Sequence, residues 1–121
     1  NSKIKVMGFV EKEDLARLYS GAEAYIYPSL YEGFGLPILE AMACGCPAIA
    51  TRAGGISEIV TSSYLGILVE RSPEAFESAI EQSMHVDWDR AKIVDHAQSL
   101  GWDKVSAKLL EIYSEALAIR K

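Results

Sequence analysis

The fold of this chain is decided by residues 27–43, which read YPSLYEGFGLPILEAMA. This pattern predicts a buried strand that ends near Tyr27, a short glycine loop, and a helix that begins near Pro37. Proline suits the first helical position, because its missing N–H would have no partner there. Gly33 and Gly35 let the backbone approach a ligand closely or take positive φ. The free amides of the loop and of the first helical turn attract anions.

Two carboxylates flank this amide-rich loop, and each has two open interpretations. Glu40 stands in an otherwise apolar run, residues 36–44. Because an unpaired buried carboxylate is costly, Glu40 needs a partner or a wet cleft; alternatively it only complements the positive helix end, worth about 0.3–1 kcal/mol. Glu32 is either a ligand-binding group or a solvated loop acid. Carboxylates accept hydrogen bonds from hydroxyls and amides donate them to phosphates, so the segment suits a ligand that is part sugar and part diphosphate.

A longer string of motifs resembles one known family. EGFGLP at 32–37 is followed by EAMA at 40–43 and GCPAIA at 45–50. This string resembles the signature of the retaining glycosyltransferases of group 1, which have the GT-B architecture. Two glutamates separated by seven residues are the hallmark of that family, as Glu32 and Glu40 are here. The resemblance extends over nearly the whole chain.

The resemblance implies a fold and a domain organisation. The expected fold class is α/β: a Rossmann-like parallel sheet flanked by helices, as in part of the C-terminal domain of a GT-B fold. Residues 1–121 are then expected to be a single, truncated, nucleotide-sugar-binding C-terminal domain. The acceptor is expected to bind mainly on an N-terminal domain that is absent from this sequence. The chain alone should therefore bind its donor weakly and not turn over.

The resemblance also assigns roles to residues. Glu32 would hold the hydroxyls of the donor sugar near the reacting carbon, as the catalytic residue. Glu40 would accept hydrogen bonds from the ribose hydroxyls. The remaining donor-binding positions act through the backbone at the base, the sugar or the phosphates: Val10, Gly33, Phe34, Gly35, Leu36, Gly54 and Gly55. Glu58 follows the second glycine turn at the family's usual place, or is simply an acid at a helix start.

The implied activity is transfer of a sugar, with retention, from a nucleotide-diphosphate sugar to an acceptor in glycan or glycoconjugate biosynthesis. The family needs no metal or other cofactor. One alternative is a non-catalytic nucleotide-sugar-binding or regulatory module. Another is a flavodoxin-like signalling domain, but the receiver type of such domains needs aspartates clustered at its strand ends, and the strand ends expected here carry none.

Composition limits the class of protein further. The chain has 121 residues, half of them hydrophobic and 24% charged, which is enough for one modest globular domain. The net charge of −5 argues against a nucleic-acid surface. The sequence contains no segment apolar enough to cross a membrane. We expect a cytoplasmic protein, a location that free thiols at Cys44 and Cys46 fit, with any membrane contact made through the absent part.

The cations and cysteines give two more expectations. No Lys or Arg occurs between Tyr19 and Ala50, so Arg52 is the nearest cation in sequence for a diphosphate. Cys44 and Cys46 are one residue apart. A disulfide at that spacing would be strained, and two ligands are too few for structural zinc, so we expect two buried free thiols and no metal site.

Strand and helix patterns alternate along the rest of the chain. We expect four strands, at residues 3–10, 24–27, 46–51 and 66–69. Helices are expected at 11–19, from 37, after 55, and at 73–84, 87–99 and 102–119. This order predicts a mainly parallel sheet with helices on both faces. So few strands leave an unpaired edge, so the isolated chain is expected to be marginally stable or to self-associate through that edge. The apolar face of the last helix is expected to be exposed.

Overall fold

The computed structural model describes residues 3–31 and 33–119, which contain one parallel sheet. The sheet has the strand order β1–β2–β3, with β1 at Tyr25–Tyr27, β2 at Ala48–Thr51 and β3 at Gly66–Val69. Ala48 is opposite Tyr25 in β1 and Gly66 in β3. All four residues of β2 are buried. The predicted parallel α/β sheet is confirmed.

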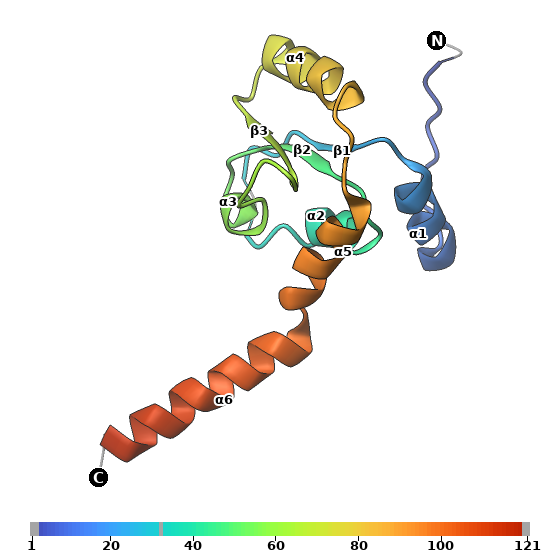
Figure 1. The fold of residues 1–121 in the computed structure, drawn as a ribbon. Coiled ribbons are helices and arrows are strands. Elements are labelled where there is room, and N and C mark those ends of the chain that lie inside the picture. Colours follow the sequence, from blue (N-terminus) through green and yellow to red (C-terminus); the bar gives the residue numbers. More distant parts are fainter. Residues whose placement is uncertain (1–2, 32, 120–121) are drawn as a thin grey trace.

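Helices cover both faces of the sheet (Figure 1). The helix α4 (Pro73–Met84) lies on one face, and α2 (Leu36–Ala43), α3 (Ile56–Ile59) and α5 (Arg90–Ser99) lie on the other. Each face has its own core. The smaller core lies between the sheet and α4 and contains Ile49, Phe76 and Ala79; the larger core includes Ile38, Met42, Ile56, Ile59, Leu65 and Ile93.

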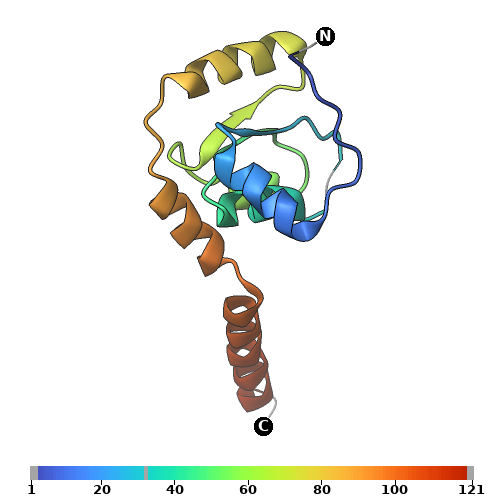
Figure 2. The ribbon, with the colours of Figure 1, turned by 90° about the vertical axis from the view of Figure 1, so that its right-hand side faces the viewer.

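The helix α1 (Lys12–Gly21) lies beside α2 (Figure 2). The Tyr19 ring at its end makes an edge-on contact with the Tyr25 ring of β1, with 5.3 Å between ring centroids. Arg90, the first residue of α5, donates to the Ala22 carbonyl at 2.8 Å and to the Gly45 carbonyl at 3.4 Å. One guanidinium therefore joins the end of α1 to the turn that follows α2.

The predicted strand at residues 3–10 is wrong. Residues 4–8 have no regular secondary structure, and the side chains of Val6 and Phe9 are 90% and 88% exposed. A strand needs a hydrogen-bonded neighbour, and none of the described strands pairs with this segment. The described residues therefore form three strands where four were expected.

The strand β1 is less buried than its apolar sequence suggests. Ile26 is 43% exposed. The helix α4 packs against β2 and β3, so the side of β1 that Ile26 faces has little cover. The expectation that this strand is fully buried is therefore wrong.

The ends of α4 and α5 are set by side-chain caps. Ser72 accepts a hydrogen bond from the Ala75 amide at 3.2 Å, so α4 begins as predicted. The helix α5 begins at Arg90 and not at residue 87, because the Asp89 carboxylate caps it by accepting from the Lys92 amide at 3.2 Å. Both Asp87 and Asp89 are good capping residues, and the pattern does not distinguish them.

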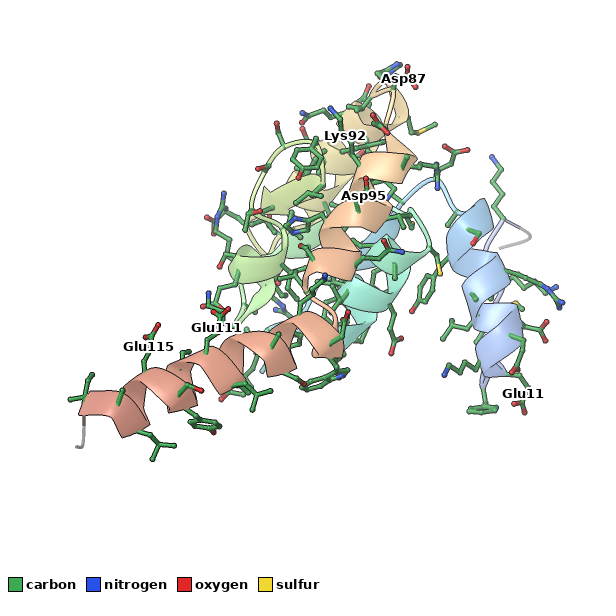
Figure 3. All side chains as sticks on the ribbon, turned by 60° about the horizontal axis from the view of Figure 1, so that its bottom comes forward. Glu11, Asp87, Lys92, Asp95, Glu111 and Glu115 are labelled. Atoms are coloured by element: carbon green, nitrogen blue, oxygen red, sulfur yellow. The ribbon has the colours of Figure 1, made fainter. Side chains whose placement is uncertain are left out.

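The last helix, α6 (Trp102–Ile119), has the predicted bounds and extends away from the rest of the chain (Figure 3). It has no buried residue, and Glu111 and Glu115 lie along one side of it. Leu109, Ile112 and Tyr113 on its apolar face are exposed, as predicted. Within residues 3–31 and 33–119, no helix combines the length and apolarity that crossing a bilayer requires.

Candidate functional site

Two glycine loops meet at the carboxyl ends of β1 and β2. The Gly55 amide donates a hydrogen bond to the Gly33 carbonyl at 3.1 Å. A Cβ on Gly55 would lie 3.0 Å from that carbonyl oxygen and 3.1 Å from the Phe34 carbonyl oxygen, so the loops approach too closely for a larger residue to fit easily. Gly35 caps α2 with φ +87°, and Gly54 has φ +52°. The structure thus brings the predicted positions 33–36 and 54–55 together.

The first loop presents unused donors. In the described part of the chain, the amides of Gly33, Phe34, Gly35 and Leu36 donate to no acceptor. Four free donors at the start of an eight-residue helix are a favourable place for an anion, since the helix dipole adds to their partial charges. The carboxyl end of a parallel sheet is also where such folds bind their ligands.

Glu40 is exposed on the side of α2 that faces α1 and β1. Burial raises the pKa of the Tyr19 phenol most, and the negative charge of Glu40 raises it further. Burial also raises the pKa of the Tyr25 phenol most, and Glu40 makes a smaller contribution there. Glu40 is the fifth residue of α2. Because the helix dipole weakens beyond the first turn, a simple helix-start role does not explain this glutamate.

Of the predicted positions, Val10 is not brought to the glycine loops, and Glu32 lies outside the described residues. Val10 precedes α1 and lines a separate hollow of about 470 Å³ with Phe9, Asp14 and Arg17. None of the described glycine-loop residues lines that hollow.

A cation that the sequence analysis missed lies at the same edge of the sheet. Arg71 follows the end of β3, as Arg52 follows β2, and its Nε donates to the Pro28 carbonyl at 3.3 Å. Both arginines line a hollow of about 220 Å³ at the strand ends. In such folds ligands bind at the carboxyl ends of parallel strands. Because β3 was predicted with its correct bounds, inspecting the residues after its carboxyl end would have identified Arg71.

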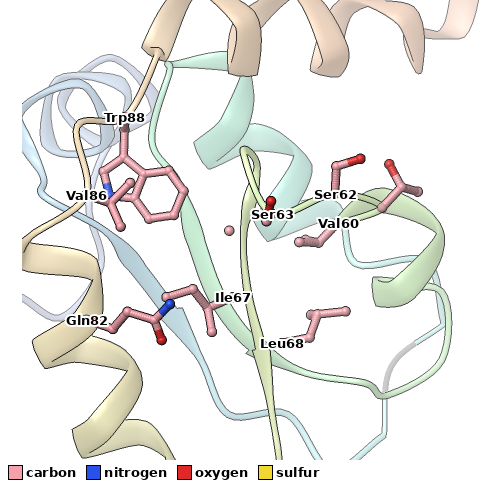
Figure 4. Close-up of a pocket in the computed structure, with 10 residues that line it drawn as sticks. Val60, Ser62, Ser63, Ile67, Leu68, Gln82, Val86 and Trp88 are labelled. Atoms are coloured by element: carbon pink, nitrogen blue, oxygen red, sulfur yellow. The ribbon is translucent and has the colours of Figure 1, made fainter.

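A larger hollow, of about 530 Å³, lies beside β3 and away from the glycine loops (Figure 4). Ser62, Ser63, Ile67, Gln82 and Trp88 are among its lining residues. None of the described residues that line it carries a formal charge. It therefore lacks the cations that a diphosphate needs, in spite of its size.

Both cysteines are free thiols, as predicted. Cys46 is buried, but Cys44 is only half-buried, because it lies at the end of α2 and not inside the core. Burial raises the pKa of the Cys46 thiol to about 11. Among the described residues, no three His, Cys, Asp or Glu side chains gather in a way that could hold a metal ion.

Alkylation should distinguish the two thiols. At pH 8 the raised pKa leaves only about one Cys46 in a thousand as thiolate, and burial also blocks the reagent. We expect iodoacetamide to modify Cys44 in the native protein and Cys46 only after unfolding in urea. Peptide mass spectrometry measures both. Equal native rates would contradict the burial of Cys46.

Comparison of the sequence with known proteins finds similarity to glycosyltransferases. The family model described as "Glycosyl transferases group 1" matches residues 1–100. O-antigen chain mannosyltransferase B of Escherichia coli is 35% identical over 114 residues, which cover 91% of this chain and 30% of that protein. A D-inositol 3-phosphate glycosyltransferase of Paenarthrobacter aurescens is 36% identical over 110 residues, covering 87% and 27%. The chain thus spans less than a third of the length of these curated relatives.

Solved structures give the same result for the fold. Sucrose-phosphate synthase from Thermosynechococcus elongatus superposes with a TM-score of 0.80 at 30% identity, covering 98% of this chain and 31% of that one. The catalytic domain of starch synthase IV from Arabidopsis thaliana superposes with a TM-score of 0.68 at 19% identity, which speaks for the fold alone. Both are GT-B proteins, so the predicted fold class is confirmed.

Proposed function

Because the chain belongs to the glycosyl transferases group 1 family, we propose that it is the donor-binding part of a retaining glycosyltransferase. The substrate that we propose is a nucleotide-diphosphate sugar, whose sugar moves to an acceptor in glycan or glycoconjugate biosynthesis. The observation that carries the proposal is the junction of the two glycine loops, where the Gly55 amide donates to the Gly33 carbonyl and the amides at 33–36 donate to no described residue. Such amides suit a diphosphate.

In this proposal, the chain binds its donor along α2. The free amides hold the diphosphate and part of the sugar, and Glu40 accepts hydrogen bonds from the ribose. Exposure of Glu40 supports that role, because an exposed carboxylate is available to hydroxyls without a burial cost. Glu32 holds the sugar near the reacting carbon. The backbone at Val10 contacts the base once the rest of the site is assembled.

The proposed reaction needs no metal, and closure of a second domain over the donor completes the site. That domain would carry most of the acceptor site, and we place the protein in the cytoplasm. A nucleotide-sugar-binding module without transferase activity is the second candidate. Turnover by the intact protein separates the two candidates.

The ribose contact is tested with Glu40→Ala. We expect this change to weaken binding of a bare nucleoside diphosphate about tenfold, because it removes charge-assisted hydrogen bonds. Isothermal titration of the intact protein with UDP and with GDP measures the effect and identifies the base. Glu111→Ala removes an equal charge from the exposed side of α6 and should bind as wild type. Unchanged affinity in Glu40→Ala would remove the chemical basis of the proposal.

A further inference from the structure

We propose that Arg52 and Arg71 form a subsite for an anionic group of a substrate, a phosphate or a carboxylate, other than the donor's diphosphate. The two arginines line a hollow of about 220 Å³ that all three strand ends build. The identity of the substrate rests on the proposed function, whereas anion binding at this place does not.

Arg71 is exposed, and one hydrogen bond already orients its guanidinium before any ligand binds. Its Nε–H donates to the Pro28 carbonyl, which leaves its two terminal NH₂ groups for another partner. Within residues 3–31 and 33–119, neither Arg52 nor Arg71 forms an ion pair. An arginine fixed by one bond loses less side-chain entropy on binding, and its planar group can hold a phosphate or a carboxylate through two hydrogen bonds.

The charge of the hollow favours an anion. Among the described residues that line it, Glu70 is the only acidic one, so two guanidinium groups and one carboxylate leave a net charge of +1 there. The chain as a whole has a net charge of −5. The charge of the hollow is thus opposite in sign to that of the chain as a whole, which favours an anion there.

Size distinguishes this hollow from the proposed diphosphate site, and it lies just before the second glycine turn, at Arg52 and Ala53. Its volume is below the range of about 300–1,000 Å³ typical of pockets that enclose a small molecule, so it suits a charged group and not a whole nucleotide sugar. Arg71 also lines a hollow with Phe76 on the α4 side of the sheet. A Cβ on Gly35, by contrast, would meet Ile56 and Ile59 of α3, on the opposite side of the sheet. The anion therefore comes from the acceptor or from the donor sugar.

The first test is a titration of the intact protein, labelled with [¹⁵N]arginine, with inorganic phosphate. We expect phosphate to shift the side-chain signals of Arg52 and Arg71. Arg71→Gln and Arg52→Gln should each weaken binding about tenfold, and Glu70→Gln should strengthen it. Arg17→Gln removes the same charge from the exposed Arg17–Asp14 pair on α1 and should change nothing. If phosphate binds to Arg71→Gln as tightly as to the wild-type protein, the proposal is overturned. It is also overturned if Arg17→Gln weakens phosphate binding as much as Arg71→Gln does.

The same titration is repeated with a saturating nucleoside diphosphate. Phosphate that still binds supports a separate subsite, whereas phosphate displaced from the two arginines assigns them to the diphosphate and overturns the proposal. If no nucleotide binds, the proposed function fails while the phosphate titration still decides the anion site.

Two further ligands identify the source of the anion. Weaker binding of a sugar monophosphate to Arg71→Gln, with unchanged binding of UDP-glucose, assigns the anion to the acceptor. Weaker binding of UDP-glucuronate, again with UDP-glucose unchanged, assigns it to the donor sugar. If Arg71→Gln affects neither ligand, the two arginines bind no anionic group of a substrate, and the proposal is overturned.

Discussion

Replacing Gly66 by alanine should lower the free energy of unfolding by about 3 kcal/mol or more. A Cβ at this position would lie 2.1 Å from the carbonyl oxygen of Ala48 and 3.0 Å from its carbonyl carbon and amide nitrogen. Relief cannot come from a side-chain movement, because the atoms in contact belong to the backbone of β2. Gly66 and Ala48 are paired in register, so the two strands must separate.

Separation of β2 from β3 is costly because β2 is the centre of the fold. Its four residues are buried, and both cores use them: Ala48 and Ala50 on one face and Ile49 on the other. For 150–250 residues each lost kcal/mol lowers Tm by about 2–4 °C, and for smaller domains by more. The Tm of Gly66→Ala should therefore fall by about 6 °C or more, as measured by circular dichroism of the intact protein.

Gly21→Ala is the matched control. Gly21 ends α1 with nothing within 4 Å of an added Cβ, and its φ is not positive. Alanine there should change the free energy of unfolding by less than about 0.5 kcal/mol. A Gly66→Ala protein that melts like Gly21→Ala would mean that β3 does not pair with β2 in the register observed here.

The elements that were predicted with their correct bounds are marked by residues at their own ends. The strand β3 and the helices α4 and α6 have the predicted bounds: Gly66 opens an apolar run, and Ser72 with Pro73 marks a capped helix start. These signals are local, so one sequence is enough to recognise them.

The errors concern contacts between distant residues. The pattern of residues 3–10 has strand character, but pairing depends on a neighbour, which the pattern does not contain. The Arg71–Pro28 hydrogen bond joins residues 43 positions apart. The contact of Gly55 with Gly33 likewise depends on how two loops meet. The sequence therefore identified the two loops of the candidate site, but neither their contact nor the second arginine beside them.

The largest functional effect is expected from Glu32→Gln, which should lower kcat about 100-fold or more while leaving the affinity for a bare nucleoside diphosphate unchanged. Positive charge develops at the reacting carbon when a glycosidic bond breaks, and the proposed role of Glu32 places its carboxylate near that carbon. Glutamine has the same shape and can still bond to a sugar hydroxyl, so the change removes mainly the charge. Its effect should therefore appear in kcat more than in KM.

Glu40→Gln is the natural partner of this test, because the proposed ribose contact lies away from the reacting carbon. Glu40→Gln should raise KM and weaken binding of the nucleoside diphosphate, while kcat stays near the wild-type value. Steady-state kinetics and titration on the intact protein with its acceptor separate the two patterns. If Glu32→Gln keeps the wild-type kcat, the reaction does not need that charge, and Glu32 only positions the sugar. If both variants fail in the same parameter, the two carboxylates act on one part of the donor, and the proposed orientation of the nucleotide along α2 is wrong.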